Sequence, residues 1–156
     1  MIIKFTLNYE NVEIDVNPLE RTLDVLRAEY GLFATKEGCG EGECGACGIL
    51  LDGNIVNSCV VPIGNVNNRE IVTIEGYSKT KRFEILSNSF KDAGAVQCGF
   101  CIPGMMIAGE ALLRKYPKPT LENIKEGISG NLCRCTGYNM IIEAINLASQ
   151  RGDGLW

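Results

Sequence analysis

The chain has 156 residues, of which 46% are hydrophobic, which is enough to bury one ordinary core or two small ones. Its formal net charge of −4 argues against nucleic acid or an anionic membrane surface as a partner. The longest apolar runs fall far below the ~20 residues that span a bilayer, and the start of the chain lacks the apolar region of a signal peptide. We therefore expect a cytoplasmic protein with no membrane-inserted segment.

The first half of the chain combines strand patterns with one helical pattern. The expected elements are strands at 2–7 and 12–16, a helix within 21–31, a hairpin within 48–59 and a strand at 70–76. Thr22 is the expected N-cap of the helix, and Asp52-Gly53 is the expected hairpin turn. Together these elements predict a small α+β domain over residues 1–76.

The second half shows only amphipathic helical patterns. Helices are expected within 81–94, 103–116, 120–128 and 138–150. Pro103 suits a first helical turn, and Thr120 is an expected cap. Met105 and Met106 are expected in the core, since thioethers fill irregular gaps. The pattern predicts an all-helical, four-helix domain over residues 81–156. Its last residue, Trp156, is either a frayed end or an anchor on a partner, and the sequence does not separate the two.

Eight cysteines and no histidine are the most unusual feature of the composition. In a small secreted protein an even number of cysteines indicates disulfides, but clustered thiols in a reducing compartment more often hold metal. The lack of histidine removes the imidazole ligands of zinc and Rieske sites. Thiolates are therefore the expected metal ligands, and no nucleophile–base arrangement suggests a catalytic residue.

The first set of cysteines has the spacing of a plant-type [2Fe–2S] site. Cys39, Cys44 and Cys47 lie in the segment CGEGECGAC, and Cys59 ends the expected hairpin. The glycines of this segment allow positive φ and let backbone N–H groups turn toward a cluster. A zinc site of four cysteines usually pairs two C-x2-C knuckles, so the C-x4-C step favours iron–sulfur over zinc.

The second set consists of Cys98-x2-Cys101 and Cys133-x-Cys135, and each pair lies beside an expected helix. Two loops at the end of a helical bundle could supply two ligands each. A C-x-C pair suits a two-iron cluster and also serves zinc, so spacing alone leaves both metals open here.

Three segments closely resemble the small iron–sulfur subunit of the molybdenum hydroxylases: KEGCGEGECGACGILLDG, VQCGFCIPGM and GNLCRCTGYNMIIEAI. That family includes xanthine dehydrogenase and aldehyde oxidoreductase. The resemblance covers nearly the whole chain. It implies an N-terminal β-grasp ferredoxin-like domain, a helical [2Fe–2S]-binding domain, and two [2Fe–2S] clusters rather than zinc.

The resemblance also implies a direction of electron flow. In the family a large subunit holds molybdopterin with molybdenum, and a medium subunit usually holds FAD. Electrons would pass from molybdopterin to the cluster of the second cysteine set, then to that of the first set, and then to FAD. Gln97 and Cys135 would lie against the pterin, whereas Glu41 and Glu43 would lie near the flavin.

The function of this chain by itself is indicated less directly by its sequence. With no flavin or molybdenum domain attached, we expect a separate subunit of an oxidoreductase, without substrate chemistry of its own. The expected substrate of the complex is a purine or another N-heterocycle, mostly on family frequency. Two other functions stay open: a free-standing two-cluster ferredoxin-type electron carrier, and a zinc-stapled scaffold.

Overall fold

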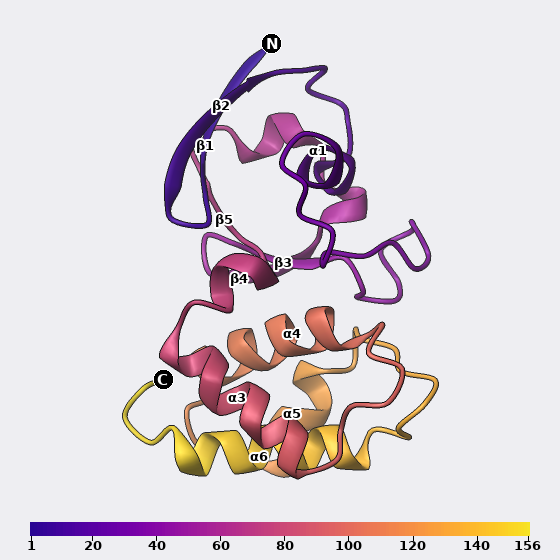
Figure 1. Cartoon of the computed structure of the whole chain (residues 1–156), viewed down its shortest axis with the longest axis vertical. Helices are drawn as coiled ribbons and strands as arrows, with labels where there is room; N and C mark the ends of the chain where they lie inside the picture. Colours follow the sequence, from indigo (N-terminus) through magenta and orange to yellow (C-terminus); the bar gives the residue numbers. More distant parts are fainter.

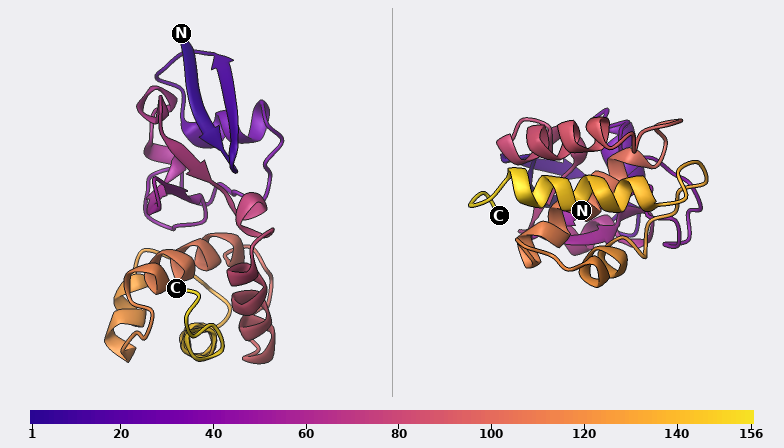
Figure 2. Two further views of the ribbon diagram at one scale, coloured as in Figure 1. Left: turned by 90° about the vertical axis from the view of Figure 1, so that its left-hand side faces the viewer. Right: turned by 90° about the horizontal axis from the view of Figure 1, so that it is seen from below.

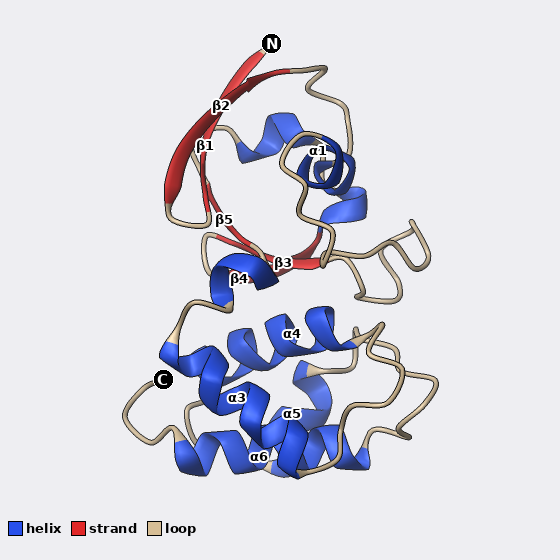
Figure 3. Ribbon diagram, in the orientation of Figure 1, coloured by secondary structure: helices blue, strands red, loops and turns tan.

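Five strands form one mixed sheet in the computed structural model, which describes all 156 residues (Figures 1 and 3). The strands are β1 Ile2–Leu7, β2 Glu10–Asp15, β3 Gly48–Leu51, β4 Asn54–Asn57 and β5 Glu70–Val72. Their order is β2-β1-β5-β3-β4, and only the β1–β5 pair is parallel. The sheet curls around helix α1, Thr22–Ala28, which is the expected β-grasp arrangement (Figure 3).

Both hairpins turn tightly because two residues in each adopt positive φ. The first turn is made by Asn8 and Tyr9 (φ 50° and 75°), and the second by Asp52 and Gly53 (φ 48° and 79°). Paired left-handed residues form the turns whose twist matches that of the flanking strands. The Asp52-Gly53 turn is confirmed, whereas β2 begins at Glu10, two residues before the expected position.

Two local predictions in this half are wrong, and in both cases a hydrogen bond to a residue distant in the sequence determines the observed structure. Thr22 is not the N-cap of α1, since Arg21 precedes the helix and the Thr22 hydroxyl donates to the Val61 carbonyl at 2.8 Å. The strand expected at 70–76 ends at Val72, because the Asn8 side chain accepts the Thr73 N–H at 2.8 Å. A short helix, α2 Ile74–Tyr77, follows instead.

Four longer helices make up the second half, as expected. They are α3 Lys81–Asp92, α4 Ile102–Lys115, α5 Leu121–Gly127 and α6 Asn139–Arg151, and two short 3-10 turns lie earlier, at Ser58–Val60 and Ile63–Val66. Thr120 caps α5 in a reciprocal capping box with Asn123. Met105 and Met106 are buried, which confirms their expected place in the core. The left view of Figure 2 shows α4 between the sheet and the other helices.

Strand β3 is buried on both faces and thereby joins the two halves. Ile49 and Leu51 belong to the core between the sheet and α1, while Leu50 belongs to the core of the helical half. Successive strand residues point to opposite faces, so one strand serves both cores. The sheet therefore rests directly on α4 and is not joined to the helices by a free linker (Figure 1).

The C-terminal tail folds back onto the helical half. Trp156 packs against that core, and its indole N–H donates to a carboxylate oxygen of Glu110 at 2.7 Å. Glu110 is fully buried and also accepts bonds from Arg82 at 2.9 Å and Arg114 at 2.6 Å. A buried carboxylate needs such paired donors. Trp156 is thus an anchor within its own chain.

Candidate metal centres

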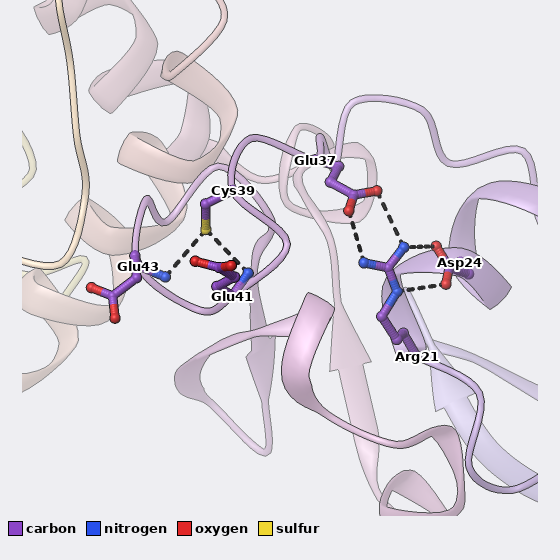
Figure 4. Close-up of polar contacts among 6 residues, drawn as sticks. All are labelled: Arg21, Asp24, Glu37, Cys39, Glu41 and Glu43. Carbon is purple, nitrogen blue, oxygen red and sulfur yellow. Dashed lines mark hydrogen bonds and ion pairs between the residues drawn. The ribbon is translucent and has the colours of Figure 1, made fainter.

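The first cysteine loop connects α1 to β3 and is shaped by its glycines. Gly40, Gly42 and Gly45 have φ of 71°, 78° and 74°, as the sequence predicted for this segment. Their left-handed turns bring three backbone N–H groups onto one sulfur. Those of Glu41 and Glu43, drawn in Figure 4, each donate to Cys39 Sγ at 3.3 Å, and that of Cys44 donates at 3.4 Å. These donors stabilise negative charge on sulfur.

An ion-pair network fixes the start of this loop to the start of α1. The Arg21 guanidinium donates to Asp24 at 2.7 Å and to Glu37 at 2.8 Å (Figure 4). Glu37, and then Asp24, raises the pKa of Arg21 above its usual range, and Arg21 lowers the pKa of Glu37. Glu37 precedes Cys39 by two residues, so the network holds the entrance of the loop.

Two side chains from the β4 end hold the other part of the loop. The Asn57 amide donates to the Gly42 carbonyl at 2.7 Å, and the Ser58 hydroxyl donates to the Cys47 carbonyl at 2.7 Å. Both residues directly precede Cys59 in the chain. The same two anchors therefore hold the loop and carry the fourth cysteine to it.

The thiols of the first set influence one another's pKa. The strongest effects are between Cys39 and Cys44 and between Cys59 and Cys47, and Cys39 also acts on Cys59. The backbone N–H donors lower the pKa of Cys39 to about 7, whereas burial, followed by the Cys47 thiol, raises the pKa of Cys59 to about 11. Cys47 and Cys59 are buried and Cys39 is exposed, so one pair faces the core and the other lies toward solvent.

The second set of cysteines comes from two loops that only tertiary packing brings together. Cys98 and Cys101 directly precede α4, and Cys133 and Cys135 lie in the loop before α6. In Figure 1 both loops lie on the same side of the molecule as the first cysteine loop, opposite the C-terminus. All three cysteine loops therefore gather along one edge of the protein.

Hydrogen bonds within the 133–138 segment position Cys133. The Thr136 hydroxyl donates to Cys133 Sγ at 3.2 Å, and the Cys133 N–H donates to the Tyr138 hydroxyl at 3.0 Å. Tyr138 has a φ of 72°, which turns the chain into α6. Burial opposes ionisation of Cys133, but the hydroxyl and N–H of Thr136, the Cys135 N–H and the Cys101 thiol together lower its pKa.

In the second set too, the strongest effects on the pKa join thiols of different loops, and weaker effects act within each loop. Cys101 interacts with Cys133, and burial, followed by that thiol, raises the pKa of Cys101 to about 12. Cys135 interacts with Cys98, and this thiol raises the pKa of Cys135. Pairing across the loops is the arrangement expected where two segments share one bound group.

Each set supplies the four thiolates that a [2Fe–2S] cluster needs. Each iron of such a cluster takes two protein thiolates. No three or more His, Cys, Asp or Glu side chains are arranged to hold one ion. All eight cysteines are free of disulfides. The donors on Cys39 and Cys133 Sγ suit the negative charge of a thiolate-bound cluster.

Gln97 is the remaining residue that the sequence singled out, and it lies exposed beside exposed Cys98. The structure adds Asn57 and Thr136, whose contacts with the cysteine segments were not predicted. Each lies within two residues of a cysteine (Cys59 and Cys135), and this proximity is the only sequence signal that could have indicated them.

Comparison with known proteins adds two family matches that divide the chain as the cysteines do. The family described as 2Fe-2S iron-sulfur cluster binding domain matches residues 5–69, and the [2Fe-2S] binding domain family matches residues 73–146. The nicotinate dehydrogenase small FeS subunit of Eubacterium barkeri is 46% identical over 149 residues, covering 96% of this chain and 95% of its own. This chain is a small iron–sulfur subunit of the molybdenum hydroxylase family.

Other relatives agree in sequence and in fold. The xanthine dehydrogenase iron-sulfur-binding subunit of Escherichia coli O157:H7 is 41% identical, with 92% of this chain and 91% of that one covered. The crystal structure of quinoline 2-oxidoreductase from Pseudomonas putida 86 contains a chain with a TM-score of 0.89 and 39% identity, and 97% of each chain is covered. The mouse xanthine dehydrogenase/oxidase matches 97% of this chain with 12% of its own length.

Membership settles the general function of this iron–sulfur subunit. It serves electron transfer in an oxidoreductase complex and binds two [2Fe–2S] clusters. None of its helices has the length and apolar character needed to cross a membrane.

Proposed function

We propose that this chain relays electrons from a large molybdopterin-binding subunit to a medium FAD-binding subunit, using two sets of cysteine ligands. The observation that carries the proposal is that each half contributes four cysteines without disulfides, within the residues that the two [2Fe-2S] family models match. When bound, each [2Fe–2S] cluster supplies one-electron transfer. The first cluster is held by Cys39, Cys44, Cys47 and Cys59, and the second by Cys98, Cys101, Cys133 and Cys135.

The exposed residues beside each site support a direction for the relay. Gln97 and Cys135 are exposed in the helical half and would contact the molybdopterin of the large subunit. Glu41 and Glu43 are exposed on either side of the Cys39 sulfur, as Figure 4 shows, and would face the flavin subunit. The three cysteine loops along one edge of the molecule would connect these two contacts (Figure 1).

The substrate class of the complex follows from its relatives. Nicotinate, xanthine and quinoline, the substrates in the names of three of them, are all nitrogen heterocycles. Two aldehyde oxidoreductases from Desulfovibrio are also similar, but at 33% identity. We therefore propose that the complex oxidises a purine or another N-heterocycle, with the substrate bound by the large subunit.

Metal analysis tests the cluster assignment. The anaerobically purified chain should contain about four iron atoms and about four acid-labile sulfides, and it should be red-brown. A colourless chain containing zinc would contradict it. Copurification tests the partners, because a chain that always runs alone while the other subunits assemble without it would be a free-standing electron carrier.

A pair of serine variants tests the direction of the relay. Cys135→Ser should stop electron transfer from molybdenum, whereas Cys44→Ser should still allow reduction of the molybdenum by substrate and of the second cluster, and block the later transfer. Stopped-flow absorbance and low-temperature EPR of the purified complex distinguish the two outcomes. If both variants fail at the same first step, the proposed order of the clusters is wrong.

A further inference from the structure

The two cysteine sites touch through the backbone across the boundary between the halves. The Leu132 N–H donates to the Cys44 carbonyl at 2.9 Å. Cys44 belongs to the first cysteine set, and Leu132 directly precedes Cys133 of the second. A path from one sulfur to the other therefore runs along the covalent chain and crosses one short hydrogen bond.

The side chain of Asn131 makes a second hydrogen bond between the same two loops. Its amide donates to the Gly45 carbonyl at 3.2 Å, next to the Leu132–Cys44 bond, and only 5% of the residue is exposed. Buried polar groups are hydrogen-bonded in folded proteins, so the amide has a fixed place. Two consecutive residues of one loop thus bind two consecutive carbonyls of the other.

The opposing surface is shaped to let the loops approach closely. A Cβ on Gly45 would lie 2.5 Å from the Asn131 amide nitrogen and 2.6 Å from the Gly130 carbonyl oxygen. A Cβ on Gly104, in the first turn of α4, would overlap the Gly45 carbonyl oxygen. The absence of side chains at both positions is therefore what allows the backbone contact between the two halves.

We propose that Asn131 is a positioning residue for electron transfer between the two clusters. Its buried amide holds the 130–133 loop against Cys44 and Gly45 and so keeps the hydrogen bond between Leu132 and Cys44 closed. This inference rests on the ligand assignment proposed above. The exchange involves one electron, so one cluster is oxidised as the other is reduced, and no bond is made or broken.

A purely structural role for Asn131 makes a different prediction. In that case its loss would weaken the helical half and release the second cluster. A positioning role leaves both clusters bound and changes only how they communicate. The test therefore needs the full chain with both clusters loaded, and a readout of each cluster separately.

The experiment compares Asn131→Ala and Asn131→Asp with Asn88→Ala, an exposed asparagine of α3 that makes no side-chain hydrogen bond. The iron content of each variant is measured first. About four iron atoms in the wild-type chain show that both clusters are loaded, so failure at this step concerns the proposed function and not Asn131. The Asp variant places a carboxylate oxygen against the Gly45 carbonyl and should have the larger effect.

Three outcomes are expected for the Asn131 variants. Hydrogen exchange at the Leu132 amide should accelerate about fivefold in the Ala variant, as loss of one hydrogen bond predicts. The EPR signal of each singly reduced cluster should be unchanged, while the magnetic splitting between the two reduced clusters should decrease. Electron exchange between them, followed after flash reduction, should slow by about tenfold, because small displacements strongly affect geometry-limited rates. Asn88→Ala should match the wild type.

Each contrary result overturns the inference. Unchanged exchange at the Leu132 amide means that Asn131 does not hold the bridge. Faster amide exchange with an unchanged electron-transfer rate means that the bridge is not the route between the clusters. Selective loss of the second cluster from both variants means that Asn131 supports the site itself. A Gly104→Ala variant, whose Cβ would displace the Gly45 carbonyl that the Asn131 amide binds, should also slow electron transfer.

Discussion

The two cysteine sites of this small chain are built in opposite ways. In the first, three cysteines lie within nine residues, and the loop supplies its own N–H donors to Cys39. In the second, the cysteines come from two loops separated by α4 and α5, and none of the four is fully buried. The first site depends chiefly on local backbone conformation, and the second depends on the packing of a helical bundle.

This difference predicts that the two clusters respond to different mutations. A change in the helical core should release the second cluster and spare the first, and a change in an anchor of the first loop should do the reverse. The largest effect is expected where packing is lost, and smaller effects where one hydrogen bond or one surface ion pair is lost.

Ile145→Ala should have the largest effect. Ile145 is fully buried on α6 in the helical core, and truncating it should lower the free energy of unfolding by about 3 kcal/mol. The second cluster should be lost at a lower temperature than the first, as followed by visible circular dichroism and iron content. Leu121→Ala, at an exposed helical position, is the matched control. If both clusters are lost at the same temperature, the two halves unfold as one cooperative unit, coupled through the core that contains Leu50.

Asn57→Ala should affect the first site alone. It removes the hydrogen bond to the Gly42 carbonyl and should cost about 1 kcal/mol of stability, which makes the first cluster more labile toward chelators. Asn54→Ala is the control, because the Asn54 amide donates to a carbonyl in the exposed hairpin turn. Equal rates of iron release from the two variants would show that Asn57 does not anchor the loop.

Thr136→Val should change the second cluster electronically while leaving it bound. Loss of the hydroxyl donor to Cys133 Sγ destabilises the more negative, reduced state and should lower the reduction potential by about 30 mV. Redox titration monitored by EPR measures the shift, and Thr136→Ser, which keeps the hydroxyl, should restore the potential. A shift of the first cluster instead would contradict the assignment of Cys133.

Arg21→Ala should have the smallest effect, and that effect should depend on pH. Arg21 lowers the pKa of Glu37 below its ordinary value of 4.5, so the ion pair stabilises the fold above pH 4.5 and its contribution is lost as the pH falls through the lowered pKa. The difference in melting temperature from the wild type should be small near neutral pH and vanish in acid. Lys79→Ala removes a charge that has no ion-pair partner and should show no such pH dependence.

The sequence predicted the features whose causes lie close together along the chain. The Asp52-Gly53 turn, the Thr120 cap and the positive φ of Gly40, Gly42 and Gly45 all follow from neighbouring residues. The cysteine spacing and the motifs around it likewise identified the family and its two clusters. The assignment of individual ligands stays a prediction, for which the serine variants are the test.

Only the tertiary structure determined the features whose partners are distant. The Thr22 hydroxyl bonds to a carbonyl 39 residues away, Asn8 ends β5 from 65 residues away, and Trp156 reaches Glu110 across 46 residues. The contact between Asn131 and Gly45 spans 86 residues. Local propensity carries no information about such pairs, because their energy appears only after loop closure has brought them together. The sequence alone therefore indicated two electron carriers, and the fold placed two of the loops that would hold them in direct hydrogen-bonded contact.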